Sequence, residues 1–143
     1  MSNYKGPYNS LSQNAEPIYN QSNILGTVSQ SDGVPTGAII ERGSNANGEY
    51  VKFADGTLIL YFPRQTAAVT TPQGGGFTSP AVMLTYPLQP SALISSNGGG
   101  GTCSATGCFV VTKVLSSQVE VQVKSFTSVT STVFDLCLLS RWY

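Results

Sequence analysis

The chain has 143 residues, which is enough for one compact domain, and only 10% of them are charged. Seven Lys and Arg residues balance seven Asp and Glu residues, so no excess charge is present to attract nucleic acid or an anionic membrane. Histidine is absent, which removes His-dependent catalytic arrangements and most zinc sites, and no phosphate-binding glycine motif occurs. We therefore expect no enzyme, no cofactor and no nucleic-acid partner.

Residues 1–30 are polar, and their scattered aromatic and aliphatic side chains follow neither a helical nor a strand period. The interpretation is an extended arm that docks on another protein and becomes ordered there; a disordered terminus is the alternative. The first residues lack the apolar run of a secretory signal, and no apolar stretch is long enough to span a bilayer. We expect a protein that is made in the cytoplasm and does not insert into a membrane.

Three antiparallel strands are predicted after the arm, and they span residues 36–42, 49–54 and 57–62. The Asp55-Gly56 pair predicts a two-residue type I′ hairpin turn, because Gly favours positive φ and Asp tolerates it. A loop of six residues, 43–48, is predicted between the first two strands. Pairing across these connections places Arg42 opposite Glu49.

The predicted register sorts the side chains of these strands onto two faces. The expected core face consists of Ala38, Ile40, Val51, Phe53, Leu58 and Leu60. The opposite face keeps Ile39, Tyr50, Ile59 and Tyr61, which is more apolar surface than a freely solvated sheet normally carries. We expect a second layer or a neighbouring copy of the chain to cover this face, and these four residues, together with Trp142, are the candidates for an interface between copies.

Four further strands are predicted at residues 81–86, 108–115, 118–124 and 133–139. The third of these alternates strictly, so its odd-numbered valines should point inward and its polar residues outward; the valines are Val119, Val121 and Val123. Cys137 lies in an apolar run and is expected to be a small buried residue. Because no segment has a sustained helical period, the predicted fold class is all-β, a small antiparallel β-sandwich formed by residues 31–143 with residues 1–30 as its arm.

Glycine-rich loops at residues 73–76 and 97–101 can adopt nearly any backbone conformation. Loops this permissive are either passive spacers or adaptable contact surfaces. The candidate contact residues are Gln73, Gly74, Gly75, Asn97, Gly98, Thr102, Ser104 and Thr106. Cys103 and Cys108 lie close together in the sequence, and they either form a disulfide or remain two thiols.

The carboxylates offer one catalytic arrangement, a glycosidase-type pair. Glu41 and Glu49 approach each other across the predicted first loop, and Asp55 lies one strand length away. The simpler interpretation pairs Glu49 with Arg42, leaves Glu41 as a solvated charge at a sheet edge and assigns Asp55 to the turn. Acid catalysis needs a pocket that raises a carboxyl pKa, and the sequence indicates none, so catalysis is not expected.

Two stretches of the sequence, Leu25 to Ser31 and Gly33 to Thr57, resemble a motif of phage and prophage tail-fibre proteins. The final residues, Ser140-Arg141-Trp142-Tyr143, are similar to the end of those proteins, although the usual apolar-Gly step before Arg-Trp is here Leu139-Ser140. A weaker similarity links Phe77-Thr78-Ser79-Pro80-Ala81-Val82 to a Phe-x-x-Pro-x-Val element of H-type lectin-like sandwiches. The resemblance covers residues 24–62 well and the rest loosely.

The resemblance implies a homotrimeric virion protein whose far end contacts a bacterial surface receptor, often a glycan and otherwise a protein. Relatives usually carry a long fibre shaft before the motif, whereas here roughly two dozen residues precede it. This difference favours a short fibre or a stand-alone tip whose arm binds another tail or baseplate protein. The alternative is a structural virion protein, a head spike or a tail adaptor, that contacts only other virion proteins. No receptor-binding residues transfer, because the loops match no family motif.

Overall fold

The computed structural model describes residues 20, 22–93, 100–103 and 108–143, with the backbone alone for 93 and 100–103. No helix occurs among these residues, and the prediction of an all-β fold is confirmed. The first strands are β1 (Gln30–Ser31), β2 (Val34–Pro35), β3 (Ile40–Asn45), β4 (Gly48–Phe53), β5 (Thr57–Val69), β6 (Thr71–Gln73) and β7 (Gly76–Thr78). The remaining strands are β8 (Val82–Thr85), β9 (Ala92–Leu93), β10 (Gly100–Cys103), β11 (Cys108–Val114), β12 (Gln118–Ser125) and β13 (Val129–Arg141).

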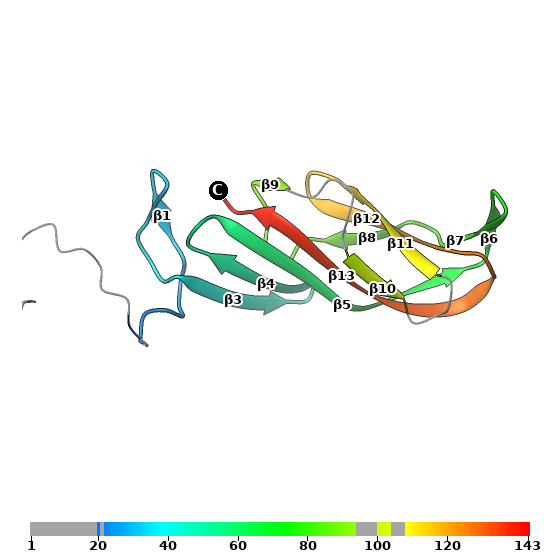
Figure 1. Ribbon diagram of the computed structural model, residues 1–143, viewed down its shortest axis with the longest axis horizontal. Helices are drawn as coiled ribbons and strands as arrows, with labels where there is room; N and C mark the ends of the chain where they lie inside the picture. The colour runs from blue at the N-terminus through cyan, green and yellow to red at the C-terminus, as the bar shows by residue number, and fades with distance from the viewer. Residues whose placement is uncertain (1–19, 21, 94–99, 104–107) are drawn as a thin grey trace, which may run out of the picture.

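Two antiparallel sheets form an elongated sandwich (Figure 1). The first sheet has the order β10-β13-β5-β4-β3, and β9 pairs with the end of β13. The second sheet has the order β11-β12-β7-β6, and β8 pairs with β12. A separate hairpin, β1-β2, lies at one end of the long axis, and the β6-β7 hairpin lies at the other (Figure 1).

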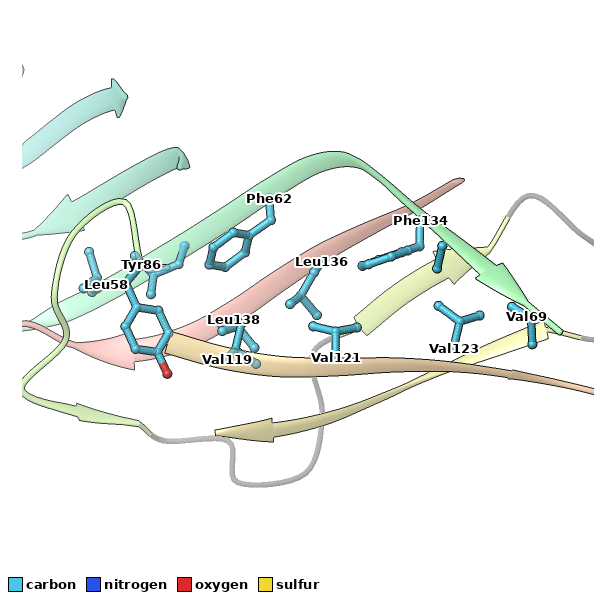
Figure 2. Packing of buried hydrophobic residues seen from close by; sticks show 12 residues of the cluster. Leu58, Phe62, Val69, Tyr86, Val119, Val121, Val123, Phe134, Leu136 and Leu138 are labelled. Carbon is cyan, nitrogen blue, oxygen red and sulfur yellow. The ribbon is translucent and has the colours of Figure 1, made fainter. Parts of the chain in front are cut away.

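The core lies between β5 and β13 of the first sheet and β12 of the second (Figure 2). Most of its fully buried side chains form three groups: Leu58, Leu60 and Phe62; Phe134, Leu136 and Leu138; and Val119, Val121 and Val123. Each group occupies every second position of its strand, as a half-buried strand requires. Burying each of these side chains contributes about 1.5–3 kcal/mol, so the sandwich is held chiefly by this layer. The prediction of inward-facing valines on β12 is confirmed.

The predicted register is wrong by one residue between β4 and β5, and by two residues between β3 and β4. Lys52 lies opposite Leu58, and Tyr50 lies opposite Leu60. The cause is the turn: Gly56 has a φ of 91° and its N–H donates to Phe53 O, but Asp55 does not adopt positive φ. The Asp55 carboxylate instead accepts the N–H of Thr57 at 2.9 Å. The loop is therefore longer than the expected type I′ turn.

A shift of one residue moves every side chain of a strand to the other face. Ile40, Val51 and Phe53, expected in the core, therefore lie on the same outer face as Ile59, while Tyr50 turns toward the core. The expected loop at 43–48 is also mostly strand, because β3 and β4 continue to a tight connection. Arg42 consequently lies opposite Val51 rather than Glu49.

The long strands β5 and β13 bend where β5 carries a bulge. Phe62 pairs with Leu136 and Gln65 with Phe134, so Pro63 and Arg64 together face Asp135. Arg64 has a φ of 50°, and its N–H donates to Asp135 Oδ1 at 2.7 Å. The carboxylate thus satisfies a backbone donor that the bulge removes from the ladder. Beyond the bulge both strands continue toward the β6-β7 end of the molecule (Figure 1).

The end of the segment expected to be an arm packs along β3. Gly26 N–H donates to Ile40 O, Ala38 N–H donates to Thr27 O, and Val28 is 1% exposed. The boundary expected between residues 30 and 31 falls within β1. Residues 1–19 and 21 lie outside the described residues.

Candidate functional site

The β6-β7 hairpin forms the tip of the molecule farthest from β1 (Figure 1). Its turn consists of Gly74 and Gly75, with φ values of 55° and 88°, as a type I′ turn requires at both central positions. Gln73 precedes the turn and is exposed. These three residues were candidate contact residues in the sequence, and the structure places them together at the tip.

A hollow of about 290 Å³ opens beside this turn. We call it the tip hollow; its lining residues are Gln73, Gly74, Gly75, Gly76, Phe77, Phe109, Lys124, Ser125 and Phe126. Gly76 allows the hairpin to approach β12 closely, since a Cβ atom there would lie 2.7 Å from Ser125 O. The tip hollow therefore depends on glycine at this position.

Exposed aromatic rings border the tip hollow. Phe126 is 74% exposed and Phe109 is 48% exposed. Phe109 on β11 pairs directly with Lys124 on β12, so the aromatic ring and the lysine side chain share the outer face of the second sheet. Apolar rings this exposed are unusual on a soluble protein unless they contact something. The tip hollow thus combines aromatic surface, a neutral amide and a cation.

The opposite end of the sandwich holds a network of satisfied polar groups. We call it the base cluster; its members are Val28, Glu41, Tyr50, Lys52 and Trp142. Lys52 Nζ donates to Val28 O at 2.6 Å and lies 3.5 Å from Glu41 Oε2. It also sits 4.1 Å from the centre of the Trp142 ring, within the range of a cation–π contact.

Glu41 accepts hydrogen bonds from two further groups of the base cluster. The N–H of Val28 donates to Oε2 at 2.8 Å, and the hydroxyl of Tyr50 donates to Oε1 at 3.1 Å. Burial alone would raise the pKa of Glu41, but these hydrogen bonds and the Lys52 charge outweigh it and lower the pKa below 4.5. Burial, followed by the bond to Glu41, raises the pKa of the Tyr50 hydroxyl above 10.0. The base cluster therefore ties the segment before β3 to the sandwich, and it does so while Glu41 is ionised.

Two residues expected in an oligomer interface are engaged within the base cluster. Tyr50 packs against the hydrophobic core as well as bonding Glu41. The Trp142 indole N–H donates to Phe53 O at 2.7 Å, and its ring packs on the core. The argument that placed Tyr50 on the outer face is therefore wrong, because it rested on the shifted register.

The outer face of the first sheet carries an apolar stripe. Val51 pairs with Ile59, which pairs with Leu139, and Tyr61 pairs with Cys137 in the neighbouring row. Leu139 is 45% exposed and Cys137 is exposed, so the expectation of a buried Cys137 is wrong. Ile59 and Tyr61 lie on this outer stripe, as the sequence indicated. Ile39 lies elsewhere, beside a shallow apolar depression formed with Pro35, Phe53, Ala54 and Asp55.

The second group of candidate contact residues is only partly described. Asn97, Gly98, Ser104 and Thr106 lie outside the described residues. Thr102 lies on β10, and its backbone pairs with Asp135 at the edge of the first sheet. Cys108 begins β11 as a free thiol, which is its reduced state, and the side chain of Cys103 is not described. Their disulfide stays a prediction for an oxidising environment.

The carboxylates considered for catalysis lie apart. Glu41 pairs with Lys52 across the β3-β4 ladder, whereas Glu49 pairs with Tyr61 on the other face of the same sheet. The two carboxylates therefore do not face a common substrate position. Asp55 serves its turn, where the N–H of Thr57 lowers the pKa of the carboxyl below 3.8.

Sequence reasoning missed several residues of the tip hollow, among them Phe109, Lys124 and Phe126. The strict alternation of β12 correctly predicted that Lys124 points outward, and the same pattern continued to Phe126 would have suggested a shared face. Phe109 could be assigned only from the pairing of β11 with β12.

No protein-family model matches the chain, and comparisons with curated proteins and with solved structures likewise find no match. Within the described part of the chain, no helix is long and apolar enough to cross a membrane.

Proposed function

We propose that the chain is the homotrimeric receptor-binding tip of a bacteriophage tail fibre, which attaches the virion to a glycan on the host surface. The observation that carries the proposal is the difference between the two ends of the molecule. Exposed rings lie beside the Gly74-Gly75 turn at one end, and hydrogen bonds anchor Val28, in the segment before β1, at the other. Figure 1 shows these two ends, near β6 and near β1, at opposite ends of the long axis. This arrangement suits a protein that is held at its base and binds with its tip.

The composition of the tip hollow supports a glycan as the receptor. Aromatic rings offer flat apolar surface to the C–H face of a sugar, and amide groups exchange hydrogen bonds with hydroxyls. Phe109 and Phe126 supply the rings, and Gln73 supplies an amide that is exposed in the absence of ligand. The tail-fibre resemblance of residues 24–62 supports the same proposal independently.

The outer stripe supports self-association. Val51, Ile59, Tyr61 and Leu139 would leave a continuous apolar surface in water if the protein were a monomer. Burial against copies of the chain removes this surface, and a trimer does so with the tip hollows all at one end. Another tail or baseplate protein would then bind the trimer at its base.

Cell binding tests the proposal. Purified protein of verified oligomeric state is added to a panel of bacterial strains, with extracted surface polysaccharide as competitor. We expect saturable binding to at least one strain, competition by its polysaccharide, and loss of binding in Phe109→Ser. The matched control is Val111→Ser, because Val111 is exposed on the same face of β11 outside the tip hollow.

Failure of an intact oligomer to bind any strain would overturn the proposal. That result would favour the alternative, a structural virion protein such as a head spike or tail adaptor, for which the outer stripe is the supporting observation. Equal loss of binding in Phe109→Ser and Val111→Ser would instead move the receptor site away from the tip hollow.

A further inference from the structure

We propose that the tip hollow selects saccharides that carry an anionic group, a carboxylate or a phosphate ester, and that Lys124 binds this group. The inference rests on the proposed function, since it names the class of glycan bound at the same site. It is carried by the position of Lys124 among the rings, and by the lack of a carboxylate among the described residues that line the tip hollow.

Lys124 differs from two other lysines of the sandwich in what faces it. Lys52 is paired with Glu41, and Lys113 lies directly across the ladder from Glu120. Lys124 lies across from Phe109, and it forms no salt bridge with any residue that the structure describes. The charge of Lys124 is therefore free to meet an anion from outside the protein.

The described residues that line the tip hollow carry no negative charge. Glu120 is the acidic residue of the same strand, and four residues of extended chain separate it from Lys124 by roughly 13 Å. A separation of this size exceeds the Debye length of about 8 Å at physiological ionic strength, so Glu120 does little to neutralise Lys124. In a chain with no net charge, a cation whose described neighbours in the tip hollow include no carboxylate marks a local preference for anions.

The shape of the tip hollow suits a sugar unit with a charged substituent. Its volume of about 290 Å³ lies at the small end of ligand sites, which fits one or two sugar rings better than a long buried chain. A Cβ atom at Gly74 or Gly75 would have no neighbouring atom within 4 Å, so the turn leaves space for the ligand. A ring of the sugar would lie on Phe109 or Phe126 while its anionic group meets the ammonium of Lys124.

The ammonium group does not by itself distinguish a carboxylate from a phosphate. Lysine presents a compact charge rather than the planar fork that arginine offers to both anions. The anionic group could thus come from a uronic acid or from a sugar phosphate. The experiment therefore uses one polymer of each kind with its neutral counterpart.

The test measures binding of the oligomer to immobilised polyglucuronic acid, its carboxyl-reduced form, phosphomannan and dephosphorylated mannan. We expect at least one charged polymer to bind about fivefold or more tightly than its neutral counterpart. Lys124→Gln should remove this preference, so that the charged polymer and its neutral counterpart bind the variant equally tightly. Lys113→Gln is the matched control, because it removes the same charge from the same face outside the tip hollow.

Each outcome decides between the inference and the function on which it rests. Binding to cells without preference for either charged polymer overturns the inference and leaves the proposed function standing. Equal weakening by Lys124→Gln and Lys113→Gln also overturns it, because the attraction would then be nonspecific. Absence of binding to cells and to all four polymers overturns both.

Discussion

The two ends of the sandwich use the same kinds of side chain in opposite ways. At the base, the cation Lys52 is held by Glu41, by a backbone carbonyl and by the face of Trp142. At the tip, the cation Lys124 lies beside exposed Phe109 and has no such partners among the described residues. Interactions satisfied within the chain stabilise the fold, whereas groups left available are suited to a ligand. The comparison agrees with the proposal that the base stabilises the fold and that the tip binds a receptor.

Removing Glu41 should have the largest effect on stability while leaving binding at the tip unchanged. Glu41→Ala leaves the Val28 N–H and the partly buried Lys52 without their acceptor, so we expect unfolding to become easier by about 2 kcal/mol. Cell binding at the tip should remain unchanged at temperatures where the variant is folded. Urea denaturation measures the first quantity, and Glu120→Ala is the control, with an expected effect below about 0.5 kcal/mol. Similar losses in both variants would contradict the special role of the base cluster.

A methyl group at Gly76 should affect both stability and binding. Its Cβ would lie 2.7 Å from Ser125 O, so the β6-β7 hairpin must move away from β12. We expect Gly76→Ala to cost about 1.5 kcal/mol, as overpacking does, and to weaken cell binding several-fold. Thr71→Ala in the same hairpin is the control, because Thr71 is exposed. Wild-type binding by Gly76→Ala would show that recognition does not need this geometry.

Acid should weaken the base before it affects the core. The folded state lowers the Glu41 pKa below its usual 4.5, so the ionised carboxylate stabilises the fold at pH values above 4.5. This contribution is lost as the pH falls through the lowered pKa, because the Glu41 carboxyl is then protonated in both the folded and the unfolded state. The stability difference between wild type and Glu41→Ala should therefore shrink below pH 4.5. Urea titrations at pH 7 and pH 3 measure it, and a constant difference would exclude the proposed ionised state.

Substitution of the most exposed ring should have the smallest effect on stability. Phe126→Ser removes a side chain that is 74% exposed, so we expect a change within about 0.5 kcal/mol. Cell binding should nevertheless fall at least fivefold. Met83→Ser, at an exposed apolar position outside the tip hollow, should change neither quantity. A large loss of stability in Phe126→Ser would indicate that the ring supports the fold instead.

The sequence predicted strands more reliably than it predicted their register. Two Asp-Gly pairs show how far a turn, and with it the register of the strands it joins, can be predicted from the sequence. Asp32-Gly33 adopts positive φ at both residues, 51° and 82°, and forms the turn expected of such a pair. At Asp55-Gly56 only the glycine does so, and Trp142 N–H donates to Gly56 O while the Tyr143 ring lies 3.2 Å from a Cβ built at Gly56. Contacts from the far end of the chain accompany the second turn, and no local pattern contains them.

The tip hollow was predictable only in part, again because it depends on contacts between segments that lie far apart in the sequence. The glycines of 73–76 indicated a permissive turn, and alternation placed Lys124 outward. Their meeting depends on the pairing of β7 with the last residues of β12, where Phe77 lies opposite Ser125. Strand order is a property of the whole sheet, so the sequence could supply the parts of the tip hollow but not their assembly.

An image of the whole virion tests most directly the claim that the molecule is held at its base and binds with its tip. The account predicts that the β6-β7 hairpin and Phe126 form the outermost point of the fibre, with Glu41 and Lys52 on the side of the particle. A hairpin packed against other virion proteins, with the base cluster facing outward, would contradict it.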